Sequence, residues 1–253
     1  MSGVEPGTPC WADLATPDLA DAKRFYRQLF GWTERVSRQP QADGYITFLL
    51  DGRAVAGAGP SAATGEIPVW STYVATDDAD LAASRVQAAG GQVVVAPFDV
   101  FDQGRMGVFA DPGGATFSVW QPRAMRGAEV FNVPGSLTWS ELVTPDPDGA
   151  HRFYELVFGW HLVNGPTGPV SYPAWRCGAR IVAGVTPLRE GLPAQLSAYW
   201  SVFFAVADAD AAATRAAQLG GTILVPPGDF PQGRLATLRD PSGALFSILA
   251  PAT

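Results

Sequence analysis

The stretch GTPCWADLATPDLADAKRFYRQLFGW, from Gly7 to Trp32, decides the fold because the chain contains it twice. It returns as GSLTWSELVTPDPDGAHRFYELVFGW, from Gly135 to Trp160, displaced by 128 residues. A second matched pair, FDQGR…DPGGATFSV and FPQGR…DPSGALFSI, closes each half and is displaced by 129 residues. A repeat this long predicts two similar domains, and 253 residues suffice for two of ordinary size.

Each half opens with an apolar strand followed by a helix. The expected strands are residues 9–14 and 137–143, and the Thr-Pro-Asp triplets at 16–18 and 144–146 predict the helix starts. In this prediction the threonine caps the helix and the proline takes its first position. Gly31 and Gly159 stand where a left-handed helix end is wanted. Two strands joined by the turn Asp51-Gly52 follow in the first half.

The pattern then restarts inside each half. A strand at 69–75 and a helix at 77–89 end at Gly90-Gly91, and the last strands flank the turn at 111–114. The second copy repeats this order up to the turn at 240–243. The chain is therefore predicted to be an α+β protein of four βαβββ units in tandem. The expected domains are 1–122 and 135–253, joined by a linker at 123–134.

Composition limits the partners. The net charge is −7 and no basic run occurs, which argues against nucleic acid and membrane surfaces as partners. The N-terminus lacks a signal peptide, and no window approaches the roughly 18 apolar residues of a membrane span, so we expect a cytoplasmic protein. Cys10 and Cys177 occupy non-equivalent positions and predict no disulfide.

Together, the four βαβββ units, the FY…FGW helix end, the Gly-Gly helix stop and the DP-x-G turn resemble the vicinal oxygen chelate superfamily. This superfamily contains glyoxalases, bleomycin-resistance proteins and extradiol dioxygenases. The chain looks most similar to its two-domain actinobacterial glyoxalase-like "hydroxylase" members. The resemblance implies that paired units form cup-shaped mixed sheets that hold a ligand, and hence two cups. It does not name a reaction, because the superfamily carries out unrelated chemistries.

The resemblance also implies where metal ligands would stand. Metal-dependent members place histidine, glutamine or glutamate there, as octahedral divalent ions require nitrogen and oxygen ligands. The corresponding positions here hold Trp11, Ser71 and Ser118 in the first half, and Trp139, Ser201 and Ser247 in the second. The fourth-strand positions, near 56–59 and 183–185, offer no carboxylate or imidazole. We therefore expect no metal and no cofactor, and regard ordinary glyoxalase or dioxygenase activity as improbable.

An acid follows each of the two tryptophans at a spacing of two. Strand alternation puts Asp13 on the face of Trp11, and Glu141 on the face of Trp139. A carboxyl group in an apolar cup is costly unless paired, and desolvation raises its pKa into the range useful for acid–base catalysis. Alternatively, each acid only accepts hydrogen bonds that stabilise the cup. Both interpretations of these catalytic candidates stay open.

Aromatic residues are the other candidates for contacting a ligand. The expected lining residues are Tyr73, Trp120, Trp175 and Phe203, whereas the matched pairs Trp32/Trp160 and Trp70/Trp200 are expected in the core. Arg105 and Arg234 belong to repeated Gln-Gly-Arg motifs and either clamp a ligand carboxylate, pair with the cup acids or brace their own loops. The linings differ between the copies, which favours two cups that do unequal work.

Two functional hypotheses follow. The first is a metal-independent binding protein that sequesters an antibiotic or another small aromatic molecule, neutral or cationic. The second is a metal-independent enzyme of specialised metabolism, with Asp13 or Glu141 as acid or base in an isomerisation, cyclisation, lyase or hydroxylation-type step. Either would act as a monomer or homodimer.

Overall fold

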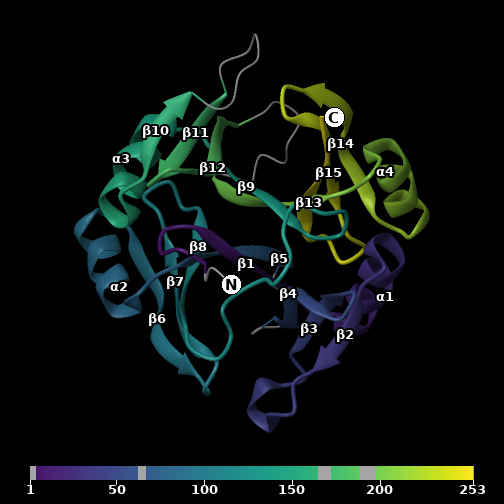
Figure 1. Ribbon diagram of the computed structural model, residues 1–253, viewed down its shortest axis with the longest axis horizontal. Coiled ribbons are helices and arrows are strands. Elements are labelled where there is room, and N and C mark those ends of the chain that lie inside the picture. The colour runs from purple at the N-terminus through teal and green to yellow at the C-terminus, as the bar shows by residue number, and fades with distance from the viewer. Residues whose placement is uncertain (1–3, 62–66, 165–171, 189–197, 253) are drawn as a thin grey trace. The chain divides into compact units, whose positions relative to one another are not determined.

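The computed structural model describes residues 4–61, 67–164, 172–188 and 198–252. The first half forms an eight-stranded sheet in the order β2-β3-β4-β1-β5-β8-β7-β6 (Figure 1). Its elements are β1 (Pro9–Thr16), α1 (Leu19–Phe30), β2 (Thr33–Val36), the 3-10 turn Pro40–Ala42, β3 (Ile46–Leu50), β4 (Arg53–Pro60), β5 (Val69–Ala75), α2 (Ala79–Ala88), β6 (Gln92–Val100), β7 (Gly104–Ala110) and β8 (Thr116–Pro122).

The second half repeats this sheet in the order β10-β11-β12-β9-β13-β16-β15-β14. Its elements are β9 (Leu137–Thr144), α3 (Pro147–Phe158), β10 (His161–Asn164), β11 (Pro173–Cys177), β12 (Arg180–Pro187), β13 (Tyr199–Ala205), α4 (Ala209–Gln218), β14 (Thr222–Phe230), β15 (Gly233–Arg239) and β16 (Leu245–Pro251). Both sheets mix parallel and antiparallel pairs, so the predicted α+β fold of four βαβββ units is confirmed. No helix in the described residues is long and apolar enough to cross a membrane.

The helix starts differ from the prediction by two residues. Asp18 and Asp146, not the threonines, cap α1 and α3, accepting hydrogen bonds from the backbone N–H groups of Asp21 and Gly149. Thr16 and Thr144 instead accept from the N–H of the capping aspartates at 3.3 Å. The aspartate is a better cap than the threonine here because its carboxylate accepts the backbone N–H of the residue three positions later. Its negative charge also interacts favourably with the positive end of the helix dipole.

The predicted helix ends and the first hairpin are confirmed. Gly31 and Gly159 end α1 and α3 with φ of 74° and 69°, in the left-handed region. Asp51 and Gly52 both have positive φ, as a two-residue turn between β3 and β4 requires.

The described chain divides into two compact units, each drawn from both halves. Unit 1 contains residues 1–10, 72–127 and 139–201, and unit 2 contains 11–71, 128–138 and 202–253. Within unit 1, α2 packs beside α3, and within unit 2, α1 packs beside α4 (Figure 1). Each unit therefore joins a βαβββ motif of the first half to one of the second.

The core of each unit contains a buried tyrosine that binds a turn aspartate. In unit 1 the Tyr154 hydroxyl donates to Asp111 Oδ2 at 3.1 Å and accepts the indole N–H of Trp200 at 2.8 Å. Burial raises the pKa values of both Tyr154 and Asp111, and the nearby carboxylate raises that of Tyr154 further. The network supplies hydrogen-bond partners to three buried polar side chains, and Asp111 accepts in addition from the Ala115 N–H at 2.9 Å.

Unit 2 has the same network with different residues. The Tyr26 hydroxyl donates to Asp240 Oδ2 at 3.0 Å and accepts the N–H of Trp70 at 2.8 Å. Trp70 and Trp200 lie in the cores, as do Trp32 and Trp160, and their predicted core roles are confirmed. The aspartates of the DP-x-G turns thus hold distant parts of the chain together.

Trp175, expected to contact a ligand, belongs to the core of unit 1. It is fully buried, packs 5.2 Å from the Tyr154 ring and 5.4 Å from Trp160, and donates its indole N–H to His151 at 3.4 Å. The sequence prediction is corrected here because β11 turns this side chain toward α3. A register shift at Trp175/Arg176 interrupts the regular pairing of this strand with β12.

Candidate functional site

Asp13 lies at the centre of a small polar cluster in unit 2. β1 carries Asp13 beside Gly57 of the parallel strand β4. Tyr45, just before β3, donates its hydroxyl to Asp13 Oδ2 at 2.8 Å. Together with Trp11, these residues form the acid cluster of unit 2.

Gly57 makes this arrangement sterically feasible. A Cβ atom at Gly57 would lie 1.9 Å from the Tyr45 hydroxyl oxygen and 3.1 Å from the indole nitrogen of Trp11. Real side chains essentially never approach so closely, so the tyrosine can cross β4 only over a residue without a side chain. The glycine therefore brings a phenol to the acid.

The environment of Asp13 changes its titration. Desolvation by burial raises its pKa to about 6, although hydrogen bonding from Tyr45 and the nearby indole of Trp11 lowers it. The residue as a whole is partly accessible to solvent, although its carboxyl group is strongly desolvated. A carboxyl group with these properties changes charge near neutral pH and can exchange a proton with a bound molecule.

Unit 1 contains the corresponding cluster around Glu141. Tyr172 donates its hydroxyl to Glu141 Oε2 at 2.5 Å and accepts the indole N–H of Trp139 at 3.0 Å. Gly184 pairs with Glu141, and a Cβ there would lie 1.7 Å from the Tyr172 hydroxyl oxygen. These residues, with Thr186, form the acid cluster of unit 1.

The two acid clusters differ in how completely the carboxylate is bound. Thr186 donates its hydroxyl to the second carboxylate oxygen of Glu141, Oε1, at 3.2 Å. Glu141 is 5% exposed, whereas Asp13 is partly accessible. Gly59 occupies the position that corresponds to Thr186, so Asp13 has no equivalent hydroxyl partner.

The remaining lining candidates are mostly buried. Ser118, Ser201 and Ser247 are almost fully covered, and Ser247 lies 3.1 Å from the Thr237 hydroxyl oxygen. Ser71 is partly accessible. Their neutral hydroxyl groups are weak candidates for binding a charged ligand group.

The aromatic candidates are also largely covered, each within its own unit. Tyr73 directs its hydroxyl to Met106 Sδ at 3.8 Å, and Trp120 donates its indole N–H to the Met125 carbonyl at 2.9 Å. Phe203 is 4% exposed. These rings pack within the sheets.

The two arginines of the Gln-Gly-Arg motifs brace their own loops, which is one of the three roles that the sequence left open for them. Arg105 binds Asp80 through two nitrogens at 2.9 Å and Asp99 at 3.0 Å. Arg234 binds Asp210 and Asp229 in the same way. These acids raise the pKa values of both arginines. Bidentate pairing with nearby aspartates uses the donors that a ligand carboxylate would need.

The donor set does not fit the metal that the fold family implies. In the described residues, no three His, Cys, Asp or Glu side chains gather in a way that could hold an ion. An indole N–H such as that of Trp11 has no lone pair to give a metal. At Gly57, the space beside the acid is taken by the Tyr45 hydroxyl. The described chemistry is that of a hydrogen-bonded acid and not of a coordination site.

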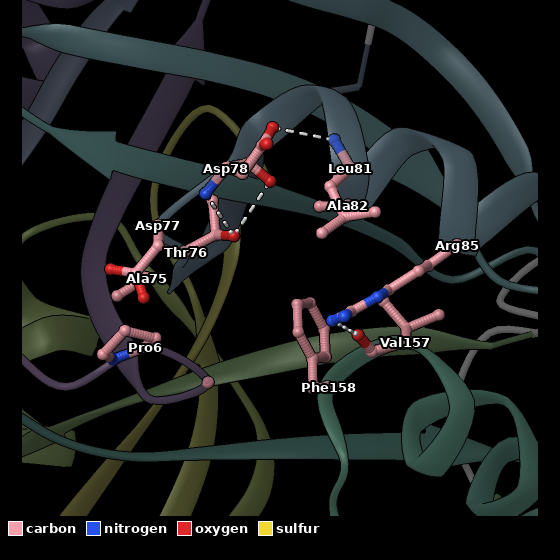
Figure 2. Close-up of a pocket in the computed structure, with 11 residues that line it drawn as sticks. Pro6, Ala75, Thr76, Asp77, Asp78, Leu81, Ala82, Arg85, Val157 and Phe158 are labelled. Atoms are coloured by element: carbon pink, nitrogen blue, oxygen red, sulfur yellow. Dashed lines mark hydrogen bonds between the residues drawn. The ribbon is translucent and has the colours of Figure 1, made fainter.

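A separate cavity of about 220 Å³ lies in unit 1, and none of its lining residues belongs to an acid cluster. Figure 2 shows Phe158 facing the start of α2, and Arg85 reaching from α2 to the Val157 carbonyl oxygen at 3.5 Å. Its remaining lining comes from the turn at Pro6-Gly7 and from residues 75–82. Its polar groups are mostly solvent-exposed or helix-capping, so it provides no buried group that would select a ligand.

Sequence reasoning missed Tyr45, Tyr172 and the two glycines beside them. All four are matched between the copies, Tyr45 with Tyr172 and Gly57 with Gly184, at a common displacement of 127 residues. That shared displacement is the signal that could have found them. The tyrosines were expected only as the first residues of strands at 45–50 and 172–177, and their contact with the acids depends on the pairing of neighbouring strands, which one strand's sequence does not reveal.

Comparison with known proteins identifies the family. The model of the Glyoxalase/Bleomycin resistance protein/Dioxygenase superfamily matches residues 10–119 and 136–248, so the chain belongs to this superfamily and carries its domain twice. The resemblance noted from the sequence is thereby confirmed.

Two relatives are similar over almost their full length. Anthracycline biosynthesis protein DnrV of Streptomyces peucetius is 43% identical, with 98% of this chain and 95% of the relative covered. Putative glyoxylase CFP32 of Mycobacterium bovis is 42% identical, covering 99% and 97%.

Solved structures show the same fold at low sequence identity. The Mn(II)-bound glyoxalase of Novosphingobium aromaticivorans has a TM-score of 0.66 at 18% identity, covering 99% of this chain and 83% of that one. The 2,3-dioxygenase LapB of Pseudomonas sp. KL28 has a TM-score of 0.64 at 17% identity, covering 100% and 94%.

Proposed function

We propose that the protein binds a planar, hydroxylated aromatic small molecule of the anthracycline type, without a metal, at an acid–tyrosine–tryptophan cluster. The observation that carries this proposal is Asp13, a partly accessible acid with a pKa of about 6, held beside Tyr45 and Trp11. The naming of one relative for anthracycline biosynthesis supports the ligand class.

The chemistry of the cluster suits such a ligand. A carboxylate accepts a hydrogen bond from a phenol or a protonated amine, and charge-assisted bonds of this kind are about twice as strong as neutral ones. The phenol ring of Tyr45 is partly accessible and provides flat apolar contact at little cost in conformational entropy, whereas the Trp11 indole is 3% exposed. The acidic net charge of −7 favours neutral or cationic ligands over anionic ones.

Calorimetric titration with a soluble anthracycline tests this proposal. We expect saturable binding that neither EDTA nor added Mn²⁺ changes, and no comparable binding of a saturated ring system of similar size. Absence of binding up to the solubility limit, or binding that requires the metal, would reject it.

A second candidate is an enzyme in which Asp13 donates or accepts a proton. Its pKa of about 6 favours this candidate, because a group that titrates near neutral pH exchanges protons efficiently. Incubation with the bound compound, followed by mass spectrometry and chiral chromatography, detects a product. Product formation by the wild type that Asp13→Asn abolishes while binding persists identifies an enzyme, and no product identifies a binding protein.

A further inference from the structure

We infer that the two acids are not equivalent: Asp13 contacts the ligand through its second carboxylate oxygen, Glu141 is a structural acceptor, and residues 59 and 186 decide which is which. This inference rests on the proposed function and deepens it. It assigns a donor group, a phenolic hydroxyl or a protonated amine, to the part of the ligand that meets Asp13.

The strand registers establish that residues 59 and 186 correspond. Gly59 on β4 pairs with Ala15, two residues after Asp13. Thr186 on β12 pairs with Val143, two residues after Glu141. The two positions therefore stand at the same place relative to their acids.

Both carboxylate oxygens of Glu141 accept hydrogen bonds from other side chains of the protein. Its two carboxylate oxygens accept from Tyr172 at 2.5 Å and from Thr186 at 3.2 Å. It is 5% exposed and Thr186 is 8% exposed. A carboxylate bound on both oxygens and withdrawn from solvent has little capacity left for a ligand.

Asp13, in contrast, has fewer hydroxyl donors than Glu141 and is more accessible to solvent. Asp13 accepts a hydrogen bond from Tyr45 at Oδ2, the indole of Trp11 also acts on its carboxylate, and no described residue supplies the second hydroxyl that Thr186 gives to Glu141. Glycine at 59 supplies no hydroxyl, and Asp13 is partly accessible where Glu141 is buried. A partly accessible carboxylate that lacks this second hydroxyl keeps lone pairs for a donor of the ligand, and such a hydrogen bond adds to affinity.

Reciprocal substitutions test the inference by calorimetry with an anthracycline bearing a free phenol. Gly59→Thr gives Asp13 a hydroxyl donor at the position from which Thr186 binds Glu141. We expect this substitution to weaken binding of the anthracycline about tenfold or more. Gly59→Ala is the matched control, because its Cβ would lie 3.2 Å from Tyr45 Cδ2 without adding a donor. Asp13→Asn should weaken binding similarly, and the wild type should bind one ligand per chain.

Opening the other cluster gives the reverse test. Thr186→Gly removes the second donor to Glu141, and we expect a second ligand to bind each chain. Two equal sites in the wild type, or affinities in Gly59→Thr and Asp13→Asn equal to that of the wild type, would overturn the inference.

A ligand-independent measurement separates this inference from the proposed function. Carbodiimide-activated amine labelling, read by peptide mass spectrometry, should modify Asp13 and spare Glu141, and Thr186→Gly should make Glu141 reactive. If the wild type binds no aromatic compound, the proposed function fails, while this labelling pattern still supports the asymmetry. Equal labelling of both acids in the wild type overturns the asymmetry whatever the binding result.

Discussion

At the scale of single residues, Gly57 controls access of Tyr45 to Asp13. A methyl group there would meet the tyrosine hydroxyl at 1.9 Å, whereas one at Gly59 on the same strand would meet only Tyr45 Cδ2 at 3.2 Å. We expect Gly57→Ala to displace the tyrosine and lower the free energy of unfolding by about 2 kcal/mol, and Gly59→Ala to cost less than about 1 kcal/mol. Urea unfolding measures both, and equal effects would contradict the steric argument.

Asp13 also predicts a pH dependence of stability. Burial raises its pKa from 3.8 to about 6, so the folded protein holds this proton more tightly than the unfolded chain. Its contribution to stability is therefore full below about pH 4 and is lost as the pH rises through 6. Asp13→Asn stays neutral and can still accept from Tyr45, so it should gain about 1 to 3 kcal/mol relative to wild type between pH 4 and 8.

Asp51→Asn is the matched control for this titration. Asp51 is an exposed turn residue with a φ of 49°, a conformation that asparagine adopts equally well. A gain of the same size in Asp51→Asn would show that the pH effect does not come from Asp13.

Alternation correctly put an acid and a tryptophan on one face, but it could not reveal what else reaches them. Tyr45 does not belong to β1, and its hydroxyl reaches Asp13 only because Gly57 on β4 has no side chain. Trp175 was suggested as a lining residue only as the counterpart of Phe48, and both side chains are fully buried in the cores of their units. Hydroxyl partners such as Thr186 depend on register between strands, which the sequence of one strand does not contain.

At the scale of elements, the sequence correctly predicted side-chain caps at the starts of α1 and α3 but assigned them to the threonines, two residues too early. Both Thr-Pro-Asp triplets announce a helix, and the structure begins it after the aspartate. The short strands β2 and β10 carry few apolar residues and were not located from the sequence. Long apolar strands such as β5 were predicted with the observed bounds, since burial fixes their pattern.

The cap makes a direct prediction for α3. Asp146→Ala removes the acceptor of the Gly149 N–H, which lies at 2.9 Å, and should destabilise the protein by about 1 kcal/mol. Asp146→Asn retains an acceptor and should cost only a few tenths of that. Thermal unfolding compares the two, and equal losses would mean that charge and not the hydrogen bond is important.

At the scale of the whole molecule, buried tyrosines connect segments of the two halves within each unit. Tyr154→Phe leaves Asp111 and the Trp200 N–H without this partner, so we expect a loss of about 2 to 3 kcal/mol in the free energy of unfolding. Tyr26→Phe should cost a similar amount through Asp240 and Trp70. A loss below about 0.5 kcal/mol for either variant in denaturant titration would show that these networks contribute little.

The composition of the units also predicts the behaviour of separated halves. Neither residues 1–134 nor 135–253 contain all the segments of a unit. Each half expressed alone should therefore lack a folded monomer and should gain ordered structure only on self-association or on mixing with the other half. Sedimentation and circular dichroism measure this, and a stable folded monomer of either half would contradict it.

The order in which the segments leave the ribosome gives this nesting a further consequence. Unit 1 is complete once residue 201 has been synthesised, whereas residues 11–71 of unit 2 must wait for residues 202–253. During that interval the nascent chain carries Phe25 and Tyr26 without their ring contact to Phe246, and Trp32 without its contact to Phe204. The first helix to be made is thus among the last to be covered, and it is the segment most exposed to chaperone binding or aggregation during translation.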